Sequence, residues 1–430
     1  MIKVSNIIDV ALDVKTTRQV KGSYSTLVYA IASLEKLKNV DYNNSILPSV
    51  IKTSAGEYKY NQKVSEDGTD EVTHVICSNL DEVESVISDA FIHANAKLFF
   101  EAGGVELLLM VPSKSSDGLI TKDTFMSDID NARKISNDFI YVLLSTKLLP
   151  SYMTFEVARE IAQETKTIKV PETIRLLMTI NSNNISQIRD LNFTNVYVGL
   201  KYSTKKYDSD SYYDTAILIG AYYTKINLDG DNTIKDYCYT QEDYFVTNEA
   251  NKSMSLVENV SQSLYKELIE DSEKGYFNFI DSIGNRVINF GGNYSSSEGI
   301  AISTDFGHIC VENDICYATL EAIIGKQYLT EQGLTNIVGA INSQLQRYKT
   351  NGYLSQGAQY SGNDYTINYN GKSYEVIKRN TLLPTGYRIF TIPVANISAA
   401  DRAAKKFPPI SVVMETQSGA RKVQIIGEVR

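Results

Sequence analysis

The chain has 430 residues and a net charge of −9 at pH 7, with 43% hydrophobic and 22% charged residues. These values are typical of a globular protein with two or three domains, and they exclude a disordered or fibrous chain. The acidic balance also disfavours binding to nucleic acid, because a phosphate backbone repels it.

No stretch approaches the roughly 18 apolar residues that a membrane span needs, and the first fifteen residues, which contain two aspartates, are unlike a signal peptide. We therefore expect synthesis and folding in the cytosol. The four cysteines match no zinc-binding spacing, and we expect buried free thiols rather than disulfides. They are Cys77, Cys238, Cys310 and Cys316.

Residues 2–14 alternate between apolar and polar side chains, which predicts an amphipathic strand at the amino terminus. Its apolar face consists of Ile2, Val4, Ile8, Val10, Leu12 and Val14. Residues 422–430 show the same alternation and predict a second terminal strand, with Val423, Ile425 and Val429 on one face. Two interpretations are open: each strand completes the sheet of its own domain, or it is donated to a neighbouring subunit by β-augmentation. The residues alone slightly favour the first.

The amino-terminal half alternates between strand and helix patterns, which predicts a layered α/β domain. A capping-box pattern at Asn79 and Glu82 predicts one helix that runs through Leu98 and ends at Gly103-Gly104. Residues 39–73 are polar and predict exposed loops, and a polar, tyrosine-rich stretch at 201–214 marks a domain boundary. Strands are expected at 25–30, 72–77, 105–111, 139–144, 174–180 and 196–200, and further helices at 125–135, 155–162 and 185–190.

The second half predicts an α+β domain with longer helices. We expect helices at 256–268 and 334–348, the latter closed by Asn351-Gly352, and strands at 276–281 and 286–290. A hairpin over 363–377 has Asn370-Gly371 at its turn. A short helix is capped by Ser398 and stopped by Pro408-Pro409.

The sequence contains only weak candidates for catalytic or ligand-binding motifs. Asp305, His308, Cys310 and Cys316 lie close in sequence, but their spacing is not one that holds a metal. Residues 227–234 resemble the start of a calcium loop, yet Asn232 stands where glycine is needed and Cys238 where glutamate is needed. We interpret them as a β-turn between two strands. Gly103-Gly104 follows a helix rather than preceding one, so it is not a phosphate-binding loop. The sequence therefore predicts no catalytic, cofactor or metal site, and no enzyme.

Several short patches resemble contractile-tail sheath proteins. Residues 94–105 resemble the A-x-x-F-F-x-x-G-G turn of that family, and residues 78–83 resemble its S-L-D-E-V helix start. Residues 276–285, the helix end at 351–354 and residues 399–410, which resemble A-D-R-A-x-R-x-P-P-I, follow in the expected order. Residues 31–70 match nothing in that family.

This resemblance implies a multi-domain sheath-like fold of the α+β or α/β class, with a mixed-sheet core domain and extended terminal strand arms. The expected division is an arm at 1–18, an α/β domain at 19–205, an α+β core domain at 206–418 and an arm at 419–430. The donated-strand interpretation then becomes the favoured one.

The resemblance further implies a structural subunit that polymerises as stacked rings around a tail tube and contracts to drive the tube through the target envelope. Its partners would be further copies of itself, the tail tube protein, the baseplate and the tail terminator, without cofactors, nucleic acid or membrane insertion. It would reside in the virion tail after assembly in the host cytoplasm. Two alternatives remain: another tail or baseplate structural protein, or an enzyme with a cryptic site around Asp305 and Cys316.

Overall fold

The structure is a computed structural model, and the residues that it describes fall into many segments. They are 24–32, 34, 50–52, 58–60, 73–149, 151–168, 172–181, 196–201, 214, 216–228, 234, 241–242, 277–281, 287–291, 302–324 and 327–417. The helices expected at 185–190 and 256–268 and both terminal strands lie outside the described residues.

A nine-stranded mixed sheet forms the core of the first part of the molecule, with the strand order β4-β5-β1-β6-β7-β8-β10-β11-β9. Neighbours from β5 through β10 run parallel, whereas β4, β11 and β9 pair antiparallel at the two edges. The strands are β1 (Thr26–Ala30), β4 (His74–Cys77), β5 (Glu106–Met110), β6 (Tyr141–Leu144), β7 (Arg175–Asn181), β8 (Val196–Lys201), β9 (Gln241–Glu242), β10 (Phe277–Asp281) and β11 (Val287–Gly291). The predicted mixed-sheet α/β class is confirmed.

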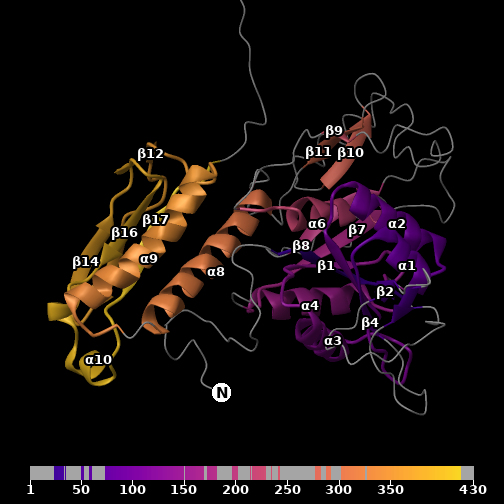
Figure 1. Cartoon of the computed structure of the whole chain (residues 1–430), viewed down its shortest axis with the longest axis horizontal. Coiled ribbons are helices and arrows are strands. Elements are labelled where there is room, and N and C mark those ends of the chain that lie inside the picture. The colour runs from indigo at the N-terminus through magenta and orange to yellow at the C-terminus, as the bar shows by residue number, and fades with distance from the viewer. Residues whose placement is uncertain are drawn as a thin grey trace, which may run out of the picture.

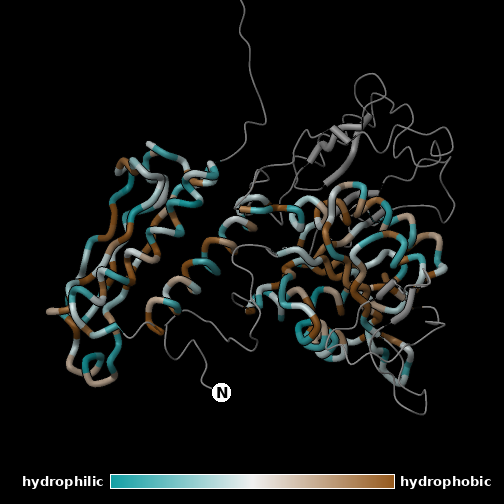
Figure 2. Tube along the Cα trace, in the orientation of Figure 1, coloured by the Kyte–Doolittle hydropathy of each residue, from teal (hydrophilic) through white to brown (hydrophobic). Residues whose placement is uncertain are grey.

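The central strands are apolar on both faces because helices cover both faces. In β1, Leu27 and Tyr29 face one hydrophobic cluster and Val28 and Ala30 face the other, all fully buried. Helices α3 (Lys122–Ile135) and α4 (Phe155–Lys166) cover one face, and α1 (Leu80–Val86), α2 (Ala90–Glu101) and α6 (Ile217–Thr224) cover the other. The hydrophobic centre of this sheet unit is visible in brown in Figure 2.

The prediction of a single helix from Asn79 to Gly103-Gly104 is wrong, because the chain forms two helices there. Asn79 caps α1 as expected, accepting a hydrogen bond from the Glu82 amide at 3.0 Å. The chain then turns extended at Ile87, and Asp89 caps α2 by accepting from the amides of Phe91 (2.8 Å) and Ile92 (3.3 Å). A second capping side chain within an apolar-periodic stretch thus starts a new helix, and periodicity alone does not reveal this.

The C-terminal unit comprises two long helices and three pairs of short strands (Figure 1). Helix α8 (Ile302–Ile324) lies between the sheet unit and α9 (Glu331–Thr350). The strand pairs are β13 (Tyr365–Tyr369) with β14 (Lys372–Ile377), β16 (Tyr387–Thr391) with β17 (Ile410–Met414), and β12 (Ala358–Gln359) with β15 (Leu382–Leu383). A turn of 3₁₀-helix, η5 (Val394–Asn396), precedes α10 (Ala399–Ala403).

Local signals in this unit are confirmed. Helix α9 ends at Asn351, and Gly352 follows with φ +74°, as the helix-closing pair predicts. The β13–β14 turn has Asn370 at φ 50° and Gly371 at φ 72°, the two left-handed residues of a type I′ hairpin. Ser398 caps α10, although that helix already ends before Pro408-Pro409.

Four features differ from the sequence expectations. Helices α6 and α8 are absent from the sequence expectations, because neither has a regular amphipathic pattern: α6 is buried throughout, and the buried residues of α8 lie on more than one side of the helix. Residues 39–73, expected as loops, include a short pair, β2 (Val50–Lys52) with β3 (Tyr58–Tyr60). Strands β9 to β11 join the same sheet as β1, so the sheet continues past the boundary expected at residues 205–206.

We expect the Asp89 cap to contribute stability through its hydrogen bonds and its charge. Burial alone would raise the pKa of Asp89, but hydrogen bonds from Lys147 Nζ (2.9 Å) and the α2 amides hold this pKa below its usual value. Asp89→Ala should lower the free energy of unfolding by roughly 0.5–2 kcal/mol at pH 7. Asp89→Asn retains a cap and should lose less.

Because the folded pKa of Asp89 is depressed, its stabilisation is present above the unfolded value near ~3.9 and is lost as the pH falls through the folded pKa. The stability difference between wild type and Asp89→Asn, measured by urea unfolding, should therefore shrink below about pH 4. A difference that grows on acidification would contradict this assignment.

Candidate assembly surface

The predicted arm residues lie outside the described residues, which begin at Tyr24 and end at Gln417. These residues are Ile2, Val4, Ile8, Val10, Leu12, Val14, Val423, Ile425 and Val429. The intersubunit role of the arms stays a prediction, and the surface that could receive such strands can be examined on the C-terminal unit.

The β16–β17 pair offers two strand edges. Its register runs from Tyr387 opposite Met414 to Thr391 opposite Ile410, and within the described part of the chain neither strand pairs with a third over this length. Among the described residues, the outer edges over β16 and β17 are therefore available to another strand, although just after β17 Thr416 already forms a bridge with Leu354. Unprotected edges of this kind are templates for pairing with another chain.

The same pair is also incompletely covered. Ile410, Val412 and Met414 lie on the side that packs against the hydrophobic cluster to which α8 and α9 contribute, yet all three remain only half-buried. The opposite side is better filled, since Val413 is 8% exposed and packs with Val376 and Ile377 of the β13–β14 hairpin. A further amphipathic strand beside β16 or β17 would bury more of this apolar surface.

A buried ion pair fixes α8 to the sheet unit. Asp305 accepts hydrogen bonds from Arg175 Nε (2.6 Å) and Nη2 (2.8 Å) at the start of β7, and from the Tyr197 hydroxyl (2.7 Å) of β8. The side chains of Arg175 and Asp305 are 16% and 12% exposed. Burial alone would lower the pKa of Arg175, but the bidentate contact with Asp305 raises it above its usual value.

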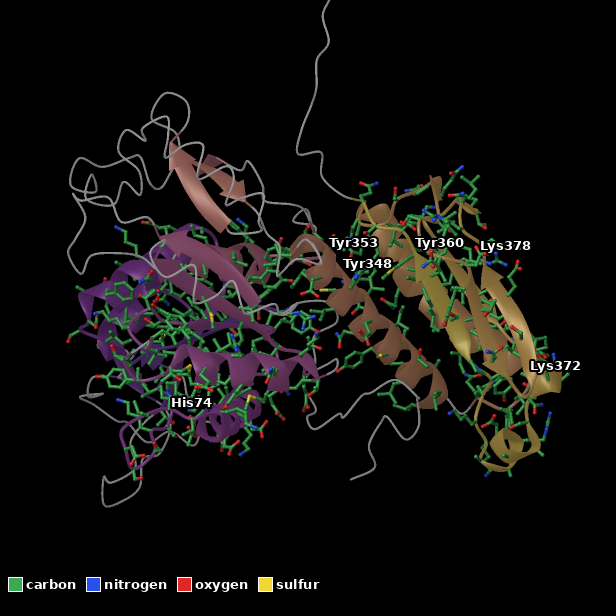
Figure 3. All side chains as sticks on the ribbon, turned by 180° about the vertical axis from the view of Figure 1, so that it is seen from behind. His74, Tyr348, Tyr353, Tyr360, Lys372 and Lys378 are labelled. Atoms are coloured by element: carbon green, nitrogen blue, oxygen red, sulfur yellow. The ribbon has the colours of Figure 1, made fainter. Side chains whose placement is uncertain are left out.

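A second buried carboxylate joins α8 to α9. Asp314 accepts hydrogen bonds from the Tyr348 hydroxyl (2.7 Å) and from Arg347 Nη1 (3.1 Å), and its side chain is fully buried. Tyr353 extends this junction by donating from its hydroxyl to the Thr304 carbonyl (2.9 Å), and Tyr348 and Tyr353 lie beside α8 in Figure 3. The two carboxylates of α8 therefore connect the sheet unit and the C-terminal unit through one helix.

The residues that resembled a metal or nucleophile site all lie on α8. Asp305 is occupied by Arg175, and burial lowers the pKa of His308 and raises that of Cys310. Burial also raises the pKa of Cys316 to about 12, so neither thiol is activated as a nucleophile. In the described part of the chain no group of three or more His, Cys, Asp or Glu side chains could hold a metal ion.

The usual ligand crevice of an open α/β sheet is filled by protein. The parallel strands β5-β1-β6-β7-β8 place the reversal of strand order at β1 and β6, where such folds bind ligands at the carboxyl ends. Here Asp214 occupies the position: it accepts from the Tyr29 hydroxyl (2.6 Å) and the Thr146 amide (3.0 Å), and its own amide donates to Asn95 Oδ1 (2.7 Å). Desolvation raises the pKa of this fully buried carboxyl. The crevice is therefore closed by the chain itself.

The segment that resembled a calcium loop is only partly described. Residues 229–233 lie outside the described residues, and α6 precedes Asn227 where we expected a strand. That expectation was wrong, because α6 is hydrophobic on all sides and its short apolar run is ambiguous between strand and helix. No described helix is both long and apolar enough to cross a bilayer.

Comparisons with known proteins agree with this architecture. Residues 307–429 match the family described as E217 tail sheath protein gp31-like, C-terminal domain. This part of the chain, from within α8 onward, is therefore similar to a tail-sheath C-terminal domain, and the predicted resemblance to contractile-tail sheath proteins is confirmed.

The fold of the whole chain is shared with solved structures of contractile systems. One is a chain of the anti-feeding prophage (AFP) baseplate, 6-fold symmetrised, with a TM-score of 0.55 and 12% identity over 96% of this chain and 95% of that chain. Another is a chain of an extracellular contractile injection system, the PVC sheath complex in its contracted state, with a TM-score of 0.56 and 9% identity over 96% of both chains. No curated protein matches the sequence.

Sequence reasoning missed the residues that hold the two units together. Arg175 begins a strand that continues with the apolar residues 176–178, and a charged residue next to a buried strand is a usable signal for a buried pair. Its partner Asp305 was noted only as a candidate ligand. Asp214 ends a polar segment in the sequence, and nothing in the neighbouring sequence indicates its burial.

Removing the partner of Arg175 should destabilise the junction strongly. Asp305→Ala leaves a poorly solvated guanidinium unpaired, and we expect a loss of about 3–5 kcal/mol in urea unfolding. Glu375→Ala is the control, because its pair with Lys378 is 58–64% exposed and should contribute less than about 1 kcal/mol. Equal losses in the two variants would refute the structural role of Asp305.

The three described thiols should react slowly in the native protein. Cys77, Cys310 and Cys316 are buried, and burial raises the pKa of each, so little thiolate forms at pH 8. Peptide mapping after brief maleimide treatment should find these three unlabelled without denaturant and fully labelled in urea. Rapid native labelling of Cys310 would contradict the described packing of α8.

Proposed function

We propose that the chain is the structural subunit of a contractile tail sheath that assembles through exchanged terminal strands. The main support for this proposal is the β16–β17 pair. Its outer strand edges and its half-buried residues Ile410, Val412 and Met414 suit the addition of amphipathic strands. The tail-sheath family match of residues 307–429 supports the same assignment.

The terminal segments have the properties that such an edge requires. Residues 2–14 and 422–430 each alternate so that one face is apolar, and an added strand could place this face over the α8–α9 side of β17. Reach is sufficient, because a fully extended segment of 23 residues spans up to about 80 Å. We propose that each arm pairs with the C-terminal unit of a neighbouring subunit, so that rings remain linked as they move.

Polymerisation would produce stacked rings around a tail tube, and contraction would drive the tube through the target envelope. The buried pairs Arg175–Asp305 and Arg347–Asp314 hold the two units of one subunit in a single packing. The change of state would therefore occur at contacts between subunits, with the extended packing metastable.

The proposed partners are further copies of the chain, the tail tube protein, the baseplate and the tail terminator. The protein would be a non-enzymatic component of the virion tail or of a phage-tail-like particle, assembled in the host cytoplasm. The filled crevice at Asp214 and the occupied Asp305 support a structural role.

A second candidate is a structural subunit of the baseplate, which the similarity to a chain of the AFP baseplate favours. The two candidates differ in assembly. A sheath forms tubes whose length increases with protein concentration, whereas a baseplate protein forms a ring of fixed size. Negative-stain microscopy of the purified chain separates them.

We predict that deletion of residues 1–14 or 421–430 leaves a folded monomer that forms no tubes. The monomer should keep its circular dichroism spectrum and urea midpoint, because the arms are expected to contribute to neighbours rather than to their own subunit. Normal tubes from both truncations would refute strand exchange.

A pair of adjacent substitutions tests the strand register itself. Val10→Asp places a charge on the apolar face of the predicted arm and should abolish tube formation, since the buried charge would lack a partner. Ala11→Asp introduces the same group on the polar face and should assemble normally. Equal effects of the two substitutions would mean that this segment is not bound as an amphipathic strand.

A further inference from the structure

One end of the C-terminal unit combines exposed apolar and cationic side chains. This C-terminal tip consists of Ile324, Tyr328, Arg402, Lys405 and Lys406. Figure 1 shows α10 at the end of the unit where α9 begins. The segment around Tyr328 lies close to the segment after α10. Both contact the first turn of α9, because a Cβ on Gly333 would touch the Tyr328 carbonyl and the Phe407 ring.

The apolar part of the tip is unusually open. Tyr328 is 80% exposed and Ile324 is 69% exposed, the two highest values among large hydrophobic residues in the described part of the chain. Aromatic residues and arginine are enriched at protein interfaces, where a buried ring is often the anchor and charges surround it. Tyr328 and Arg402 are residues of these types.

The cationic part has a strained backbone. Lys405 has φ +55° at the end of α10, where its amide donates to the Arg402 carbonyl (3.2 Å) and the Lys406 amide donates to the Asp401 carbonyl (2.9 Å). This is the Schellman geometry, whose left-handed position is usually glycine. Lysine there is sterically less favourable, so its charge is retained at the expense of local stability.

Charge is distributed unevenly along the chain. Residues 327–417 contain nine Lys or Arg and five Asp or Glu, a net charge of +4, whereas residues 302–326, which include α8, carry −3 and residues 1–301 carry −12. Two copies placed head to tail would bring opposite charges together, because a head-to-tail contact joins two different surfaces of the same chain.

From these observations we infer that the C-terminal tip docks on the acidic sheet unit of a second copy of this chain, with Tyr328 as the apolar anchor. The inference rests on the proposed function only in requiring that the chain assembles with itself. The contact would be separate from strand exchange at β16–β17, and it would weaken as salt screens the charges.

The test compares two double charge reversals in the full chain. Lys405→Glu/Lys406→Glu should weaken self-association at least tenfold in sedimentation velocity at low salt. Lys378→Glu/Arg379→Glu makes the same change in charge at two exposed residues, and should leave association within twofold. The control site is remote from α10. Tyr369, which pairs with Lys372 at the start of β14, donates a hydrogen bond to Asp401 of α10. Lys378 follows the other end of β14 (Figure 3). If both reversals weaken self-association equally, the change in net charge alone explains the effect and the proposal is overturned.

Two further variants separate docking from folding. Lys405→Gly should give an equal or higher Tm, because glycine suits a positive φ, and yet weaker association. Tyr328→Ser should weaken association with an unchanged Tm. Unchanged association in both variants would overturn the inference.

A mixing experiment identifies the partner. The sheet unit of a Lys405→Glu/Lys406→Glu subunit can still bind a wild-type tip, but its own tip cannot bind the next subunit. Substoichiometric amounts of this variant should therefore shorten wild-type assemblies. Wild-type assemblies unaffected by the variant would mean that the tip serves a different protein, and would refute docking on a second copy. If wild type forms only small oligomers that depend on the tip, the sheath proposal fails while this inference stands.

Discussion

The arrangement of the molecule depends on a carboxylate buried near the amino end of α8. Asp305 is held by Arg175 and Tyr197 from two adjacent strands of the sheet, and nine residues further along the helix Asp314 is held from α9. A charge in such a place is tolerated only with its partners present, so the pairs select one packing of the two units. Helix α8 thereby positions the β16–β17 pair relative to the sheet unit.

Another buried carboxylate lies at the position where a layered α/β enzyme would bind its ligand. An α/β sheet with this strand order normally leaves a crevice at its switch point, and here Asp214 and its partners Tyr29 and Thr146 fill it. What is left for function lies at the surface: strand edges, half-buried apolar residues and a charged tip. Those are features of a protein that completes its structure by contact with others.

The well-packed part of the chain and the part with incompletely covered apolar residues are different. The sheet has a hydrophobic cluster on each face, one of which continues into α8 and α9, and a fully buried central strand, β1. The β16–β17 pair carries apolar residues that its own chain only half covers. In a polymer that switches between two packings, a rigid subunit with incomplete edges allows large movement without unfolding.

Local sequence determined the elements whose causes are local. The Asn370-Gly371 turn, the Asn351-Gly352 helix end and the Ser398 cap follow from backbone sterics and nearby hydrogen bonds, and the alternation of apolar strands with helices established the α/β class. The sequence could not reveal the break at Asp89, because two caps compete within one periodic stretch.

Only the tertiary structure decided the roles of Arg175, Asp214 and Asp305. Their partners lie 130 residues away for Arg175 and Asp305, and 185 for Tyr29 and Asp214. A carboxylate reads the same in sequence whether it binds a metal, faces water or anchors a helix. Its burial and its distant partner distinguish these roles, and both exist only after the chain has folded.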